Sequence, residues 1–449
     1  MSDPTSSSAD ATAWTNIASA LEISLESLNA RLTEDVQVRV FCDVGGLEET
    51  IVFGWAAAGS EDGMICSVHQ QGAKVTAGKV NDAAFVLSAR PDQWQQFYQA
   101  VPKPPFQSYW GMFGQNIHQE GVEVRGDQNA FLALAPVWRR VLELSHEAVC
   151  GPVAEESSMD HGDVDAITGR YVYVDSLNWG KTKIHCEQSG DPGKTPILFL
   201  HTAGSDGRQY HAVMNHPAML DKCYMTVFDM PGHGRSFPGS HQIPGQHSNN
   251  EDAYVEVIAQ VIKRLGLVKP IVCGASMAGH ICLAVALRAD EVGAGAVIPC
   301  QACEFTDMKR NHWARSNRIN QALFNPEYVY GMMSPFSPLK ERNLLWHTYS
   351  AQAFSMYHGD LDFYFGGWDG RGRVEKIDTK RCPVYMLTGD YDWSTTPAMS
   401  EETAKKIPGA VFKAMEGLGH FPATENPVRF VKYLSDAVDC VVDQMHNAA

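Results

Sequence analysis

The stretch Pro270-Ile-Val-Cys-Gly-Ala-Ser-Met-Ala-Gly-His280 predicts a strand, a tight turn and a helix in immediate succession. Its apolar start indicates a short buried strand, and the run from Ile281 to Arg288 indicates the helix. Ser276 lies on the turn between them, with the small residues Gly274 and Ala278 on either side. A serine in this position exposes its hydroxyl group, and the backbone N–H groups of the turn can face an oxyanion. The stretch therefore predicts a nucleophilic serine, provided that a base and an acid accompany it.

Composition narrows the classes of protein to consider. A length of 449 residues predicts two or three domains, and a net charge of −16 argues against a nucleic-acid or anionic-membrane partner. The 11 cysteines are scattered and odd in number, as in proteins with reduced thiols. Residues 1–13 lack the basic start and apolar centre of a signal peptide, and no run reaches the roughly 20 apolar residues of a membrane span. We expect a soluble cytoplasmic protein with a disordered tail at 1–13.

Residues 14–149 predict a small α+β domain. Apolar residues recur at helical spacing between Trp14 and Leu32, and shorter alternating or apolar runs then predict strands at 36–41, 49–53, 64–68 and 83–88. Helices are expected at 91–97, 106–117 and 128–148, with a strand-like run at 122–126. The acidic stretch 150–166, rich in small residues, predicts a linker to the next domain.

This N-terminal domain resembles the sterol-carrier-protein fold. The likeness depends on the order of helix, strand meander and a helix with Asp92-Gln-Trp94, followed by Gly121-Val-Glu-Val-Arg-Gly-Asp127 and a final helix. The resemblance implies a helix–sheet shell around an apolar lipid tunnel. The domain could bind an apolar ligand, or it could serve only in packing or in forming a homodimer.

Strands and helices alternate after residue 167. Strand-like runs are found at 170–174, 181–186, 196–200, 224–228, 270–273, 293–299, 383–387 and 409–414. Helical runs at 208–220, 281–288, 400–407 and 428–442 separate or follow them. This order is typical of a parallel sheet with crossover helices. The predicted fold class is therefore α/β, a mostly parallel sheet with helices on both faces, preceded by the smaller α+β domain.

A loop of small residues follows the predicted strand 196–200. In His201-Thr-Ala-Gly-Ser-Asp206 the backbone N–H of Ala203, or alternatively that of Thr202, is the candidate oxyanion donor. The N–H of Met277, directly after Ser276, is the expected second donor.

The turn Asp229-Met-Pro-Gly-His-Gly-Arg-Ser236 adds a further motif, after the strand 224–228. Together with the loop at His201 and the turn at Ser276, it makes residues 167–445 resemble the α/β-hydrolases. The resemblance implies a hydrolase core at 167–300 and 371–449. It also implies a cap, inserted at 301–370, above the active site.

The same resemblance indicates the partners of Ser276. The family's acid follows a late strand, typically three residues after a glycine, which selects Asp392 in Thr388-Gly-Asp-Tyr-Asp-Trp393, with Asp390 as the alternative. His420 in Gly417-Leu-Gly-His-Phe-Pro422 follows the last strand, where the general base belongs. The order Ser276, Asp392, His420 is that of the α/β-hydrolases. This chemistry needs no metal and no organic cofactor.

The predicted cap is rich in aromatic residues and methionine. Part of this content must form the cap's own core, and the surplus predicts an apolar cavity for an aromatic substrate. The expected substrate contacts are Trp313, Trp346, Tyr357, Trp368 and Phe421.

These residues favour hydrolysis of an ester or lactone of a hydrophobic, aromatic small molecule through an acyl-serine. Hydrolysis of a carbon–carbon bond in a vinylogous or β-diketone substrate is the alternative. The Gly-x-Ser-Met stretch and the cap also resemble the meta-cleavage-product hydrolases, although Ala275 stands where those enzymes usually have asparagine. A third possibility is a non-catalytic lipid-binding protein.

Overall fold

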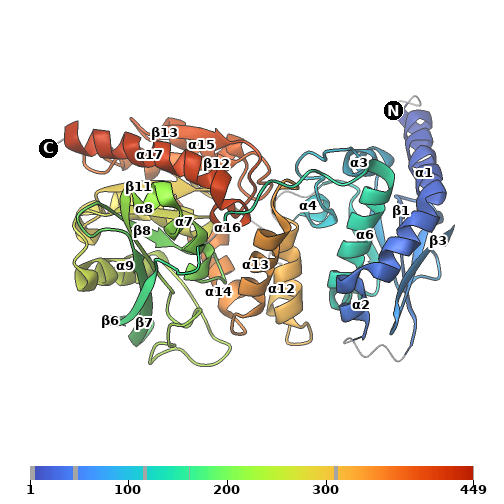
Figure 1. Cartoon of the computed structure of the whole chain (residues 1–449), viewed down its shortest axis with the longest axis horizontal. Helices are drawn as coiled ribbons and strands as arrows, with labels where there is room; N and C mark the ends of the chain where they lie inside the picture. The colour runs from blue at the N-terminus through green and yellow to red at the C-terminus, as the bar shows by residue number, and fades with distance from the viewer. Residues whose placement is uncertain (1–5, 44–48, 115–118, 161, 308–311, 448–449) are drawn as a thin grey trace. The chain divides into compact units, whose positions relative to one another are not determined.

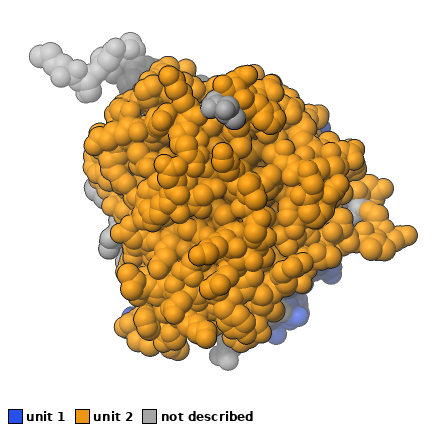
Figure 2. All heavy atoms as spheres, turned by 90° about the vertical axis from the view of Figure 1, so that its left-hand side faces the viewer, with its two compact units in different colours: residues 1–154, 316–331 blue, residues 155–315, 332–449 orange. Residues whose placement is uncertain are grey.

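The computed structural model describes residues 6–43, 49–114, 119–160, 162–307 and 312–447. They form two compact units (Figure 2). Unit 1 consists of Met1–Ala154 and Ser316–Gly331, and unit 2 of Glu155–Arg315 and Met332–Ala449. The boundary therefore falls inside the predicted linker 150–166, and part of the predicted cap 301–370 belongs to unit 1.

Unit 1 is an α+β domain with its own five-stranded sheet, in the order β3-β2-β1-β4-β5 (Figure 1). β1 pairs in parallel with β4, and the other pairs are antiparallel. The strands are β1 (Ile51–Ala57), β2 (Asp62–His69), β3 (Gly72–Lys79), β4 (Phe85–Ala89) and β5 (Glu123–Gly126). The helices are α1 (Ser6–Glu34), α2 (Val36–Asp43), α3 (Pro91–Phe97), α4 (Tyr109–Phe113), α5 (Gln128–Ala133), α6 (Ala135–Cys150) and α12 (Gln321–Tyr330).

Aromatic side chains pack closely in the interior of unit 1. The rings of Phe53 and Phe85 stack with centroids 5.2 Å apart, and those of Phe131 and Trp138 stack at 5.1 Å. Trp110 lies 4.8 Å from Trp138. Stacked and tilted rings at these distances contribute packing energy beyond the area that they bury. The protein's own side chains thus occupy this part of the interior, and the likeness to a sterol carrier protein stays a prediction.

α12 is part of this core, although it comes from the later insertion. Trp110 contacts the rings of Tyr328 and Phe324, at centroid distances of 5.3 and 6.0 Å. The guanidinium of Arg139 forms an ion pair with the carboxylate of Glu327, and these side chains are only 4% and 0% exposed. A buried charge needs such a partner, so α12 fixes part of the interior of unit 1.

Several local predictions for unit 1 are corrected by the structure. Residues 36–41 are not a strand but belong to helix α2, whose buried residues Val38 and Cys42 are four positions apart. Residues 6–13, expected in a disordered tail, begin helix α1, and residues 1–5 lie outside the described part. The helix expected at 106–117 is the shorter α4, and residues 115–118 are also outside the described part.

Unit 2 is built on an eight-stranded sheet in the order β13-β12-β11-β10-β8-β9-β7-β6 (Figure 1). The strands from β8 to β13 pair in parallel, whereas β7 pairs in antiparallel fashion with β6 and β9. The strands are β6 (Thr168–Ser176), β7 (Gly180–Ser189), β8 (Thr195–Leu200), β9 (Cys223–Phe228), β10 (Ile271–Ala275), β11 (Ala296–Cys300), β12 (Tyr385–Gly389) and β13 (Val411–Met415).

Helices cover both faces of this sheet. One apolar core contains Ile258 and Ile281 from α9 and α10, and the other contains Leu434 from α17. Strand β10 contributes Val272 to the first core and Ile271 to the second. Successive strand residues point to opposite faces, so a strand that is apolar throughout is buried on both sides. The predicted fold class is confirmed.

The remaining elements of unit 2 connect the strands. They are η1 (Gly207–Tyr210), α7 (His211–Met214), α8 (Pro217–Leu220), α9 (Glu251–Leu265), α10 (Met277–Leu287), α11 (Ala289–Val292), η2 (His312–Arg315), α13 (Leu339–Ser350), α14 (Met356–Asp362), η3 (Phe363–Gly367), η4 (Val374–Lys376), α15 (Pro397–Lys406), α16 (Pro422–Glu425) and α17 (Pro427–Asn447). None of the helices in the described ranges is both long and apolar enough to cross a membrane. All 11 cysteines are free thiols.

Candidate active site

Ser276 occupies the turn between β10 and α10. Its backbone has φ 62° and ψ −123°, a strained conformation that a non-glycine residue adopts only when its surroundings enforce it. A Cβ atom on Gly274 would lie 2.6 Å from Cβ of Ala278, and one on Gly279 would lie 2.2 Å from the carbonyl oxygen of Cys300. These close approaches explain why small residues surround Ser276. The turn is further held by a 3.0 Å hydrogen bond from the N–H of Ser276 to the carbonyl of Cys300.

The loop after β8 presents three successive backbone N–H groups. That of Thr202 donates to Oε1 of Gln209 at 2.9 Å, and that of Gly204 donates to the carboxylate of Asp360 at 2.9 Å. Between them, the N–H of Ala203 has no hydrogen-bond acceptor among the described residues. Of the two donors expected in this loop, Thr202 is therefore already engaged, and Ala203 has its N–H available.

The orientation of the Ala203 N–H is fixed indirectly. His201 receives the N–H of Met230 on Nε2 at 3.0 Å, so its proton lies on Nδ1, which donates to the carbonyl of Thr202 at 2.9 Å. In a trans peptide, the carbonyl of Thr202 and the N–H of Ala203 point in opposite directions within one plane. Anchoring the carbonyl therefore also sets the direction of the unbonded N–H.

Asp392 and His420 are joined at the carboxyl edge of the sheet. Nδ1 of His420 lies 2.8 Å from Oδ2 of Asp392, and both residues are buried. The other carboxylate oxygen accepts the N–H groups of Ser394 and Thr395, at 2.8 and 3.1 Å. Asp392 thus has a fixed orientation and holds the proton of His420 on Nδ1, which leaves Nε2 able to accept a proton.

Asp390, the alternative acid, has a different contact. Its Oδ1 accepts the N–H of Gly417 at 2.8 Å, at the start of the loop that carries His420. Asp390 therefore braces the loop, and Asp392 contacts the imidazole. The Ser276 hydroxyl makes no hydrogen bond to His420 within the described residues. The two lie on loops that follow parallel strands of the same sheet.

The sequence profile of the alpha/beta hydrolase fold matches residues 195–427, which is more than half of the chain. The chain belongs to this family. A curated relative in Mycoplasma pneumoniae, "Putative esterase/lipase 2", is 23% identical over 269 residues, covering 54% of this chain and 88% of the relative.

Solved structures show the same hydrolase fold. A thermophilic esterase from Thermogutta terrifontis superimposes with a TM-score of 0.50 and 20% identity, covering 61% of this chain and 99% of the esterase. The enol-lactonase from Burkholderia xenovorans gives a TM-score of 0.50 and 17% identity, covering 60% of this chain and all of the lactonase. Likeness at these identities establishes the fold of this hydrolase-family chain.

Three aromatic side chains lie near residues 201–206, the loop after β8 with the candidate oxyanion donor, which we call the oxyanion loop. Tyr357 is so close that a Cβ atom on Gly204 would lie 2.6 Å from its ring. Tyr349 donates to or accepts from the hydroxyl of Thr202 at 2.7 Å. Its ring lies 5.7 Å from that of Tyr357 and 5.6 Å from that of Phe421, which itself lies 5.0 Å from His420. Two predicted substrate contacts, Tyr357 and Phe421, are thus brought together, and Tyr349 was missed.

The three predicted tryptophans differ in their surroundings. Trp368 is fully buried, its indole N–H donates to the carbonyl of Cys303 at 3.1 Å, and its ring stacks on His280 at 6.2 Å. It packs in the core beside His280, and its contact with a substrate stays a prediction. Trp313 is buried in η2 and Trp346 is half-buried on α13, and their contact with a substrate stays a prediction.

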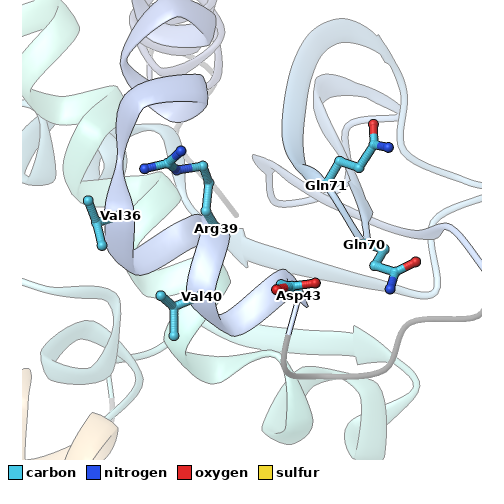
Figure 3. Close-up of a pocket in the computed structure, with 6 residues that line it drawn as sticks. All are labelled: Val36, Arg39, Val40, Asp43, Gln70 and Gln71. Atoms are coloured by element: carbon cyan, nitrogen blue, oxygen red, sulfur yellow. The ribbon is translucent and has the colours of Figure 1, made fainter.

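Sequence reasoning also missed two buried carboxylates. Asp360, on α14, receives hydrogen bonds from Gly204 and from two histidines, His233 and His247. Glu425, on α16, accepts the N–H of Gly419 beside His420. Neither belongs to a recognisable motif, so only their placement reveals them. A surface pocket of about 600 Å³ in unit 1 is lined by Val36, Arg39, Val40, Asp43, Gln70 and Gln71 and contains none of these groups (Figure 3).

Proposed function

We propose that the chain is a serine hydrolase that cleaves an ester or lactone of a hydrophobic, aromatic small molecule through an acyl-serine intermediate. The observation that carries the proposal is the Asp392–His420 hydrogen bond at 2.8 Å, at the sheet edge from which the strained Ser276 turn also emerges. Acyl transfer uses a nucleophile, an acid and a base, and Ser276, Asp392 and His420 would supply them in the chain order of the α/β-hydrolases.

In the proposed reaction, Nε2 of His420 accepts the proton of the Ser276 hydroxyl as its oxygen attacks the substrate carbonyl. Asp392 stabilises the resulting imidazolium and keeps its ring in place. His420 then donates the proton to the departing alcohol oxygen, and water repeats the sequence to release the acid.

The N–H groups of Ala203 and Met277 would stabilise the negative oxygen of the tetrahedral intermediates. Both are without an acceptor among the described residues, and that of Ala203 is held in direction by its neighbours. A donor fixed before the reaction needs no reorganisation when the charge forms, and one such donor is worth roughly 10²–10³ in kcat. Thr202 does not take this role in the proposal, because its N–H is engaged.

The substrate class follows from the aromatic side chains beside the loop. Tyr349, Tyr357 and Phe421 would contact the acyl or alcohol group, because flat apolar groups pack favourably on aromatic rings. The names of the esterase and lactonase neighbours are consistent with oxygen-ester chemistry. Asparagine before the serine, usual in the carbon–carbon bond hydrolases, is absent because Ala275 stands there.

The test is hydrolysis of p-nitrophenyl esters and aryl lactones by the wild type and by Ser276→Ala. We expect turnover by the wild type that disappears in the variant, and covalent labelling of Ser276 by a fluorophosphonate. Labelling without turnover of any ester or lactone would overturn the ester assignment and favour carbon–carbon bond substrates. A folded wild type with neither labelling nor turnover would favour a non-catalytic lipid-binding protein.

A further inference from the structure

The carboxylate of Asp360 accepts hydrogen bonds from two other segments of unit 2, the loop after β8 and the loop after β9. Oδ2 accepts the backbone N–H of Gly204 at 2.9 Å and faces Nε2 of His233 at 3.0 Å. Oδ1 faces Nε2 of His247 at 2.8 Å, and the side-chain amide of Asn249 at 3.4 Å. Asp360 itself lies on α14, in the insertion, and is 1% exposed. One buried carboxylate thus connects the insertion, the loop after β9 and the oxyanion loop.

The ring contacts of His233 assign its protons. Its Nδ1 lies 3.3 Å from the carbonyl of Pro231, which can only accept, and its Nε2 faces the carboxylate of Asp360. Both nitrogens therefore donate, and His233 is an imidazolium. Burial by itself would lower the pKa of His233, but the Asp360 carboxylate outweighs it and raises that pKa above the usual value.

His247 has the opposite assignment. Oε1 of Gln242 accepts the N–H of Gly239 at 2.6 Å, which fixes the amide so that its NH₂ faces Nδ1 of His247 at 3.1 Å. Nδ1 is then an acceptor, and the single proton lies on Nε2, which donates to Asp360. His247 is neutral, and the buried charges of Asp360 and His233 cancel. A buried charge pair of this kind is stable only because its hydrogen bonds are satisfied.

The three side chains could also be considered as metal ligands, since their ligand atoms lie within 4.8 Å of one another. The proton assignments argue for hydrogen bonds instead. A histidine binds a metal through an unprotonated nitrogen, whereas Nε2 of His247 carries its proton because Nδ1 accepts from Gln242. Gly204 and Asn249 direct further donors at the same carboxylate.

We propose that Asp360 is a positioning residue of the oxyanion loop, held ionised by His233. This inference rests on the proposed function and goes beyond it. The carboxylate fixes the N–H of Gly204, as His201 fixes the carbonyl of Thr202, so that the Ala203 N–H between them points towards the reacting carbonyl. The same contact ties helix α14 to the loop, and Tyr357 on that helix packs against Gly204. The insertion thereby shapes the oxyanion hole, and it also supplies Tyr349 and Tyr357, two of the aromatic side chains beside that hole.

The kinetic test is Asp360→Asn in the full chain, with p-nitrophenyl esters. Asparagine keeps the shape but turns one acceptor into a donor, which then faces an N–H group. We expect kcat to fall about 10- to 100-fold with KM changed less than about threefold, as for a misplaced catalytic group. Asp369→Asn is the matched control, because Asp369 is half-buried on the same insertion and its carboxylate forms an ion pair with Arg371. It should keep wild-type kcat.

Ser276→Ala separates this proposal from the proposed function. If Ser276→Ala is inactive while a folded Asp360→Asn keeps wild-type kcat, the positioning role is wrong and the serine hydrolase stands. If Ser276→Ala remains active, the proposed function itself fails. Circular dichroism and a thermal melt establish that each variant is folded.

Two further measurements decide the question if Asp360→Asn does not fold. His233→Gln should lower kcat at least fivefold more than His247→Gln, because only His233 carries the charge. In the wild type, a long-range ¹H–¹⁵N spectrum near pH 8 should show both ring nitrogens of His233 protonated and only Nε2 of His247. An unprotonated Nε2 in both rings, with a stoichiometric bound metal in elemental analysis, would overturn the proposal.

Discussion

The side chain of Glu425 accepts the backbone N–H of Gly419 at 2.5 Å, and Gly419 immediately precedes His420. The other carboxylate oxygen accepts the N–H of Ser334 at 2.8 Å and the hydroxyl of Ser337 at 3.1 Å. Glu425 thus connects the loop of the proposed base with the segment that precedes α13. Burial raises the pKa of this carboxyl group to about 7, although the neighbouring N–H groups act in the opposite direction.

This pKa predicts a pH-dependent stability. Between the ordinary pKa of 4.5 and about 7, the folded protein holds a proton on Glu425 that the unfolded chain has lost. The contribution of Glu425 to the free energy of unfolding is therefore largest below pH 4.5 and falls as the pH rises towards 7. We expect Glu425→Gln to lack this fall in urea unfolding between about pH 5 and about pH 7.5. Glu416→Gln, at an exposed position, should keep the wild-type slope; an unchanged slope in Glu425→Gln would contradict the assignment.

The contacts of Asp392 and Asp390 predict unequal kinetic effects. Asp392→Asn should lower kcat about 10⁴-fold, because an amide no longer stabilises the imidazolium and favours the wrong tautomer of His420. Asp390→Asn keeps an oxygen for the N–H of Gly417 and should lower kcat less than about tenfold. Steady-state kinetics on one ester substrate compares the two, and equal losses would count against Asp392 as the acid.

The close packing of the Ser276 turn predicts that one methyl group added at Gly279 destabilises the protein. In a helix, alanine is ordinarily more stable than glycine by about 1 kcal/mol. Gly279→Ala should instead destabilise the protein, by about 1–3 kcal/mol or more, because its Cβ would lie 2.2 Å from the Cys300 carbonyl. Urea unfolding shows whether Gly279→Ala lowers or raises the free energy of unfolding. Gly162→Ala is the control, since a Cβ there has no neighbour within 4 Å, and a stabilised Gly279→Ala would show that the turn can relax.

The Arg139–Glu327 ion pair predicts that α12 stabilises unit 1. Glu327→Gln leaves the buried guanidinium of Arg139 with Glu143 as its remaining ion-pair partner among the described residues and should cost about 3 kcal/mol. Asp62→Asn removes an exposed partner of Lys79 in the same unit and should leave stability close to that of the wild type. Urea unfolding followed by tryptophan fluorescence measures both changes. Equal, small effects would mean that α12 contributes little to the core.

Long apolar runs made the hydrolase fold predictable from the sequence. The strand around Val272 is apolar throughout and is followed at once by a helix, and only a sheet buried on both faces accommodates that pattern. The sequence predicts a strand at 36–41 because Val36, Val38 and Val40 alternate, as apolar residues do in a strand. Over only six residues this pattern also fits the period of a helix. Cys42, one position beyond the run, shows that the buried spacing is helical.

The candidate site was predictable only where residues follow strands. Ser276, Asp392 and His420 each follow a strand within five residues, and because these strands are parallel their ends meet at one edge of the sheet. Asp360 and Glu425 are brought to that edge by the folding of later segments, and no local pattern marks them. The roles of the tryptophans are hard to predict from the sequence, because an aromatic residue in an insertion can pack in the core, as Trp368 does.

Because α12 is part of unit 1, the order of synthesis matters for this chain. Arg139 meets Glu327 only after 188 further residues have been made. At typical rates of translation, that delay is roughly 10 to 40 s. The N-terminal unit therefore leaves the ribosome with a buried-charge partner and two aromatic contacts still missing. It completes its core only when most of the hydrolase sequence has followed, so part of that core stays unpaired during synthesis.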